Sequence, residues 1–176
     1  MSKLPARLHH TAYVTKDQEK TRQFYEDVIG LPLTATWCET DMLFGKERTY
    51  VHTFYGIGDG GALAFFQFAD PEMYALTQAK SPPKVGSHYH IALKVGDRTY
   101  DELKSRLDAA GEKFRETDHG YCKSIYTQSP DGMILEFTCD PPDVAEIDAM
   151  RRADAHSELA RWLAGDRHVN NDHRPH

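Results

Sequence analysis

The chain has 176 residues, of which 40% are hydrophobic and 27% are charged, and this composition excludes a mostly disordered protein. Its 21 Lys and Arg residues and 27 Asp and Glu residues give a formal net charge of −6, which leaves no basic field to bind nucleic acid or an anionic membrane. The cysteines form no C-x-x-C pair, no apolar run is long enough to cross a bilayer and no secretory signal is visible. We therefore expect a reduced, cytoplasmic protein.

The first half of the sequence predicts a strand, a helix and three further strands. The first strand spans Leu8–Thr15, and Asp17 is placed to cap the helix that follows. That helix covers Gln18–Val28 and ends at Gly30, because glycine readily adopts the left-handed conformation that closes helices. Three strand-like stretches come next, followed by a short helix: Leu33–Cys38, Thr49–Tyr55, Ala62–Phe68 and Glu72–Ala79.

The second half repeats this order. A strand over His88–Val95 precedes Asp97, a second candidate cap, and a helix over Arg98–Ala109 ends at Gly111. Three more strand-like stretches follow: Lys113–Glu116, Lys123–Gln128 and Met133–Thr138. The halves also match in spacing, because His10 precedes Asp17, and His90 precedes Asp97, by seven residues.

These elements predict an α+β fold of two tandem βαβββ modules, over about residues 7–69 and 87–140, within a single domain of residues 1–142. A C-terminal helix is expected over residues 143–165, after two prolines that break the last strand. The remaining residues, 166–176, are polar and predict a flexible tail.

Alternation along the strands directs certain polar side chains to shared faces. His90 lies on the face of its strand opposite Ile91 and Leu93, and Glu136 lies on the face opposite Leu135 and Phe137. With His10 from the first half, these residues would supply the two imidazoles and one carboxylate that suit Fe(II), Mn(II), Zn(II), Co(II) or Ni(II). The alternative is structural, because a lone strand histidine is often only hydrogen-bonded. His9 is expected to face away from His10.

Several segments resemble one known family. Leu8–Leu31 is similar to the opening module of the vicinal-oxygen-chelate superfamily, which holds glyoxalase I, the fosfomycin- and bleomycin-resistance proteins and the type I extradiol dioxygenases. His90–Val95 resembles the start of the second module, and Ser124–Tyr126 with Ser129–Glu136 resembles its closing hairpin. The resemblance spans about residues 7–140. It implies an open, cupped mixed sheet around one divalent metal, held by His10, His90 and Glu136.

The resemblance leaves several reactions open. Glyoxalase I uses a fourth ligand, a glutamate on the last strand of the first module, where this chain offers only the side-chain oxygen of Gln67. Fosfomycin-resistance proteins use three ligands and several basic residues, for which the candidates here are Lys94, Lys123 and Arg115. Extradiol dioxygenases hold Fe(II) with two histidines and a glutamate, and their substrate-binding tyrosine matches Tyr126. Fosfomycin-resistance proteins share that tyrosine.

The leading prediction is an Fe(II)-dependent, one-domain extradiol dioxygenase that cleaves the ring of a catechol-like aromatic small molecule. Tyr126 is its candidate for stabilising an oxyanion, and His119 or His88 for moving protons. Mn(II), Zn(II), Ni(II) or Co(II) could replace Fe(II) in the same donor set. The alternatives are a glyoxalase-type isomerase, a fosfomycin-resistance-type thiol transferase and a non-catalytic ligand-binding protein of the bleomycin-resistance type. A homodimer is implied by the resemblance. Aromatic residues could line the pocket or fill the core: Trp37, Tyr50, Phe54, Phe65 and Phe66.

Overall fold

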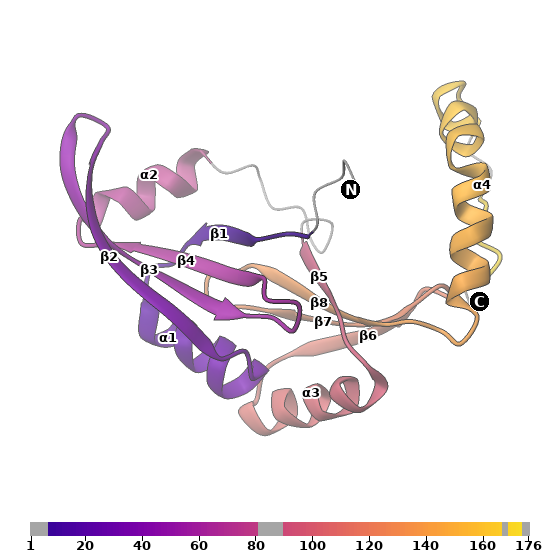
Figure 1. The fold of residues 1–176 in the computed structure, drawn as a ribbon, viewed down its shortest axis with the longest axis horizontal. Helices are drawn as coiled ribbons and strands as arrows, with labels where there is room; N and C mark the ends of the chain where they lie inside the picture. The colour runs from indigo at the N-terminus through magenta and orange to yellow at the C-terminus, as the bar shows by residue number, and fades with distance from the viewer. Residues whose placement is uncertain (1–6, 81–89, 167–168, 174–176) are drawn as a thin grey trace. The chain divides into compact units, whose positions relative to one another are not determined.

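The computed structural model describes residues 7–80, 90–166 and 169–173. These residues form two four-stranded sheets, with strand orders β1-β4-β3-β2 and β5-β8-β7-β6 (Figure 1). In each sheet a helix follows the first strand and three strands follow the helix. This arrangement confirms the predicted α+β class and the βαβββ order of both modules.

The chain divides into two compact units. Among the described residues, one unit holds 7–80 together with the turn Gln128–Met133, and the other holds 90–127 together with 134–166 and 169–173. Each unit contains one of the two sheets and its own helices.

The sheet of the first unit contains one parallel and two antiparallel pairs. β1 (His10–Val14) runs parallel to β4 (Ala62–Phe68), while β3 (Lys46–Gly56) is antiparallel to both β4 and β2 (Leu33–Leu43). β2 and β3 form one long hairpin, and both are longer than the sequence predicts. The hairpin turns at Phe44-Gly45, whose φ angles of 51° and 76° are the positive values that a type I′ turn requires.

The helical segment after β1 begins where it was predicted to begin. The Asp17 carboxylate accepts hydrogen bonds from the backbone N–H groups of Glu19 and Lys20 and so caps α1 (Gln18–Arg22). The helix closes at Gly30, with φ of 88°, again as predicted.

The later part of this segment is a π-helix (η1, Gln23–Ile29) rather than a continuation of the α-helix. A π-helix forms i→i+5 hydrogen bonds, which bring residues five apart to the same side. Phe24 and Ile29 are accordingly both buried, and the Tyr25 ring centroid lies 4.6 Å from that of Phe65 on β4. The π-helix thus packs aromatic side chains onto one face of the sheet, which leaves the opposite face for other roles.

The second unit has the same pairing pattern. β5 (His90–Lys94) runs parallel to β8 (Ile134–Cys139), and β6 (Phe114–Asp118) is antiparallel to β7 (Lys123–Gln128).

The helix of this unit, α3 (Asp97–Ala110), buries its predicted apolar stripe of Tyr100, Leu103 and Leu107 and ends at Gly111, with φ of 69°. The predicted cap at Asp97 is wrong. Gly96 occupies the capping position, and Asp97 is the first helical residue, where a carboxylate still interacts favourably with the helix dipole.

The described residues contain two further helices. α2 (Glu72–Lys80) follows β4, and α4 (Val144–Leu163) is the predicted C-terminal helix. Within the ranges that the structure describes, no helix is long and apolar enough to span a membrane.

Candidate functional site

Two side chains predicted as metal ligands meet in the second unit. In the register of β5 and β8, Ala92 pairs with Glu136, so His90, two residues before Ala92, lies diagonally across from Glu136 on the same face. The His90 Nε2 atom is 2.7 Å from the Glu136 Oε2 atom. Glu136 is only 5% exposed, whereas His90 is exposed. The pair therefore joins a buried carboxylate oxygen to the nitrogen of an imidazole that reaches solvent.

Tyr126 on β7 holds the other oxygen of the same carboxylate. Its hydroxyl donates a hydrogen bond of 2.7 Å to Glu136 Oε1. Burial, followed by the hydrogen bond to Glu136, raises the pKa of Tyr126 to about 12, so the phenol remains a proton donor at neutral pH. The Arg115 guanidinium lies 4.3 Å from the centroid of the tyrosine ring and opposes this shift. Glu136 thus has its two oxygens engaged by two different residues.

His119 extends this hydrogen-bonded chain. It lies in the turn that joins β6 to β7, and its Nε2 atom is 2.9 Å from the Tyr126 hydroxyl oxygen. Its backbone N–H donates to the Cys122 carbonyl oxygen at 2.9 Å, which closes the turn. The second unit therefore holds a continuous series of contacts that runs from His119 through Tyr126 and Glu136 to His90.

His10, the third predicted ligand, lies on β1 of the first unit. Its Nδ1 atom is 2.8 Å from the Nδ1 atom of His9, so one ring donates a hydrogen bond to the other. The ring of His10 also contacts the ring of Phe54 on β3, with 5.3 Å between the centroids. His9 does not turn away from His10 as predicted, because β1 begins only at His10 and strand alternation does not extend to the residue before it.

Two of the three predicted metal donors lie close together in the second unit. Imidazole and carboxylate ligands bound at about 2.1 Å in adjacent positions of an octahedral metal have donor atoms roughly 3 Å apart, and His90 Nε2 and Glu136 Oε2 are 2.7 Å apart in the metal-free chain. Among the described residues, no three His, Cys, Asp or Glu side chains form a group that could hold a metal ion. His10 belongs to the other unit, so its part in the site stays a prediction. His88, a candidate for proton transfer, lies outside the described residues.

Gln67, which the sequence offers in place of a fourth ligand, serves the fold instead. Its side-chain oxygen accepts a hydrogen bond of 2.8 Å from the backbone N–H of Gln18 at the start of α1. In the register of β1 and β4, His10 pairs with Ala62, so even-numbered residues of β4 share the face of His10 and Gln67 lies on the opposite face. No residue of β4 on the His10 face carries a metal-ligating side chain.

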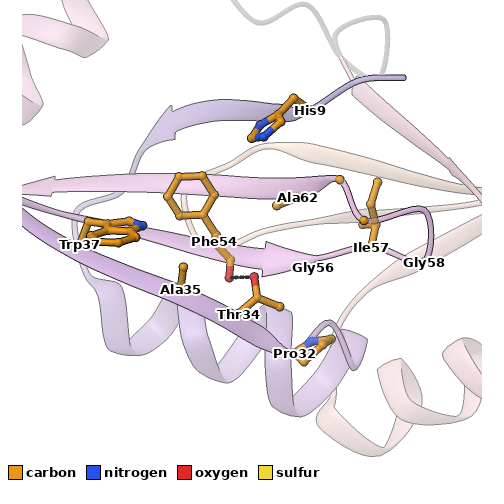
Figure 2. A pocket seen from close by; sticks show the side chains of 12 residues that line it. His9, Pro32, Thr34, Ala35, Trp37, Phe54, Gly56, Ile57, Gly58 and Ala62 are labelled. Atoms are coloured by element: carbon orange, nitrogen blue, oxygen red, sulfur yellow. Dashed lines mark hydrogen bonds between the residues drawn. The ribbon is translucent and has the colours of Figure 1, made fainter. Parts of the chain in front are cut away.

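A groove of about 590 Å³ lies beside the histidines of the first unit. Figure 2 shows the Trp37 and Phe54 rings in this groove, together with the imidazole of His9. Trp37 is 59% exposed, a large fraction for an indole. Of the residues that the structure describes, those that line the groove include no Asp, Glu, Lys or Arg: His9, Pro32, Thr34, Ala35, Trp37, Phe54, Gly56, Ile57, Gly58, Gly60, Gly61 and Ala62.

The predicted aromatic residues divide between this face and the core. Phe65 is buried against Tyr25 in the core, whereas Phe54 and Trp37 line the groove. His9, which was expected to face away from His10, is one groove residue that the sequence pattern missed.

The family profile of the Glyoxalase/Bleomycin resistance protein/Dioxygenase superfamily matches residues 7–137. The chain belongs to this superfamily. It is 23% identical over 129 residues to the glutathione transferase FosA of Serratia marcescens, an alignment that covers 73% of this chain and 77% of FosA.

Solved structures of the superfamily share the fold. The fosfomycin resistance protein FosX from Listeria monocytogenes superposes with a TM-score of 0.56 at 18% identity, over 80% of this chain and 98% of FosX. A glyoxalase/dioxygenase from Nostoc punctiforme superposes with a TM-score of 0.53 at 22% identity, over 80% of this chain and 98% of that protein. Proteins of more than one activity thus share this fold, so the choice among reactions depends on the residues of the site.

Proposed function

We propose that this chain is a metal-dependent enzyme whose divalent metal is held by His10, His90 and Glu136. The observation that carries the proposal is the 2.7 Å approach of His90 Nε2 to a buried Glu136 oxygen, with Tyr126 on the second oxygen. For His10, the contact of Nδ1 with His9 leaves Nε2 as the nitrogen for a metal, since the hydrogen bond at one ring nitrogen orients the other. The resemblance to the superfamily implies a homodimer, and sedimentation analysis would test this.

The residues around Glu136 suit a reaction that moves a proton and stabilises an oxyanion. A bound divalent metal supplies Lewis acidity, which lowers the pKa of substrate hydroxyl groups that bind to it. Tyr126 is a neutral phenol whose single O–H donates to Glu136 in the metal-free chain, so it would turn from that carboxylate to donate to an oxyanion of the substrate. Because the phenol O–H is given to Glu136, His119 Nε2, 2.9 Å from the phenol oxygen, is the donor in their contact and can supply a proton to that oxygen.

The reaction that these features favour is extradiol cleavage of a catechol-like ring by dioxygen, with Fe(II) as the preferred metal. Both atoms of dioxygen enter the product as the ring opens beside a hydroxyl group, so no external reductant is consumed. The uncharged groove with Trp37 and Phe54 supports a planar aromatic substrate. The absence of a metal-ligating side chain on the His10 face of β4 disfavours a glyoxalase-type isomerase.

Fosfomycin-type thiol transfer is the second candidate, because the chain is similar to the glutathione transferase FosA. FosX, in a structure of one of its variants, binds Mn(II) and dihydroxypropylphosphonic acid. In this chain, however, two of the three basic candidates are engaged. Lys94 forms an ion pair with Asp140, and Arg115 lies over the Tyr126 ring and donates to the Thr117 hydroxyl. A non-catalytic binding protein is a third candidate, and the proposed metal ligands His10, His90 and Glu136 weigh against it.

One experiment separates these functions. The metal-free protein is loaded with Fe(II) under anaerobic conditions and mixed with a panel of catechols, and oxygen uptake and the yellow ring-cleaved product are followed. A parallel sample is loaded with Mn(II) and given fosfomycin and glutathione, and thiol consumption is followed. We expect turnover in the first sample alone. Thiol consumption without oxygen uptake would replace the proposal with the second candidate, and inactivity in both would refute both.

A further inference from the structure

Residues 169–173, the described segment that follows α4, reach the turn that carries His119. The Asn171 side-chain amide donates a hydrogen bond of 3.0 Å to the His119 carbonyl oxygen. This segment is anchored to α4 at Asn170, whose amide donates to Glu158 at 2.7 Å and whose carbonyl oxygen accepts from Arg151 at 3.4 Å. Figure 1 shows the yellow segment alongside the helix. Residues distant in sequence from the site thus contact the backbone of one of its members.

The same turn is restrained on its other side. The His119 ring stacks on Tyr121, with 5.7 Å between the centroids and 24° between the planes. Tyr121 and Asn171 also line a cavity of about 250 Å³ between this turn, α4 and the C-terminal segment. His119 is therefore held through its backbone by Asn171 and through its ring by Tyr121, while its Nε2 atom faces the Tyr126 hydroxyl.

We propose that Asn171 is a positioning residue, which holds the His119 turn so that the imidazole stays within hydrogen-bond reach of Tyr126 and, through it, of Glu136. This inference rests on the proposed function for its consequence in catalysis, but the positioning itself is a property of the metal-free chain. It assigns a role to the C-terminal segment, whose polar composition predicts only a flexible tail. Displacing a catalytic group by about 1 Å can lower a rate by about 10²-fold, so a single hydrogen bond to the turn is enough to matter.

The test measures the His119 ring directly. Side-chain ¹⁵N NMR of the metal-free protein reports whether His119 Nε2 still has Tyr126 as its partner, and Tyr126→Phe supplies the spectrum of a ring without that partner. We expect Asn171→Leu, which removes the amide at similar volume, to shift the His119 signals towards those of Tyr126→Phe. His173→Ala changes another residue that lines the same cavity and should leave the His119 signals as in the wild type.

Activity provides the second readout. In the enzyme loaded with metal, Asn171→Leu should lower kcat by about 10- to 100-fold, with KM and metal stoichiometry unchanged, because only a step that uses His119 is impaired. A chain that ends at Asp166 should behave in the same way if Asn171→Leu does not fold. Wild-type His119 signals in both variants would overturn the inference. Shifted signals in a protein that performs neither proposed reaction would uphold the positioning role and refute the proposed function.

Discussion

Tyr126→Phe isolates the hydroxyl at the centre of the site. In the metal-free protein this substitution removes a 2.7 Å hydrogen bond to the Glu136 carboxylate. Because Glu136 is only 5% exposed, water has little access to replace the lost donor. A hydrogen bond to a charged group contributes about 1.5–3 kcal/mol to stability. Because the substitution leaves the buried Glu136 oxygen without this donor, we expect the free energy of unfolding to fall by an amount in that range. For a chain of this length, about 2–4 °C of melting temperature is lost per kcal/mol, so we expect a decrease of about 3–12 °C.

Tyr100→Phe is a matched control for this measurement. The Tyr100 hydroxyl also donates to a carboxylate, Glu116 at 3.2 Å, but the Glu116 side chain is 45% exposed and is paired with Lys104. Water can replace that hydroxyl, so the cost should stay below about 1 kcal/mol. Thermal unfolding of both variants in the presence of a chelator provides the comparison. Equal losses of stability would refute the view that Glu136 is a shielded carboxylate that depends on Tyr126.

Three further predictions concern packing and ion pairs elsewhere in the fold. Gly61→Ala should destabilise the protein by about 1–3 kcal/mol in urea titrations, because the new Cβ would lie 2.8 Å from a backbone carbonyl oxygen; a neutral result would contradict this packing. Asp70→Asn should cost about 3–5 kcal/mol by the same assay, since it leaves the Arg48 guanidinium, whose side chain is 3% exposed, without its anionic partner; a cost below about 1 kcal/mol would show that the pair is solvated. The hydrogen bond from Lys104 lowers the pKa of Glu116 in the folded protein. The pair therefore stabilises the fold at pH values above the unfolded-state pKa of Glu116, and this stabilisation is lost as the pH falls through the folded-state pKa. An NMR titration should show that Lys104→Met raises the pKa of Glu116, and an unchanged pKa would contradict the pairing.

The sequence predicts those parts of the fold that depend on local chemistry. Asp17 caps its helix because its carboxylate reaches N–H groups two and three residues ahead, and Gly30 and Gly111 close theirs because glycine tolerates a positive φ. Strand alternation likewise places His90 and Glu136 on one face, since that face is set by spacing alone.

Other features have no local signal. The π-helix has a wider turn than an α-helix, and no residue type is diagnostic of it in the sequence. Burial of Phe24 and Ile29 against the rest of the unit stabilises it. The β2–β3 hairpin is longer than predicted because the outer part of β2 is largely exposed and mixes polar with apolar residues, which gives no alternating pattern. Its I′ turn has Phe44 where Asn or Asp would be the usual sign.

The site shows the same division. Tyr126 and Glu136 follow from spacing and resemblance, and their contact is one that neighbouring strands make routinely. Asn171 lies 52 residues after His119, in a polar segment with no periodicity, so its hydrogen bond to the turn depends on where α4 returns the chain. Contacts of that kind become visible only in three dimensions.

The central claim is that His10, His90 and Glu136 bind one divalent metal. Titration of the chelator-treated protein with Mn(II), followed by calorimetry, tests it most directly in the wild type and in His10→Ala, His90→Ala and Glu136→Gln, with His173→Ala as the control. We predict one equivalent bound by the wild type and the control, and affinity lowered at least about 100-fold in each of the three variants, because a three-ligand site has no spare donor. Full occupancy in His10→Ala or Glu136→Gln at wild-type affinity would contradict the account.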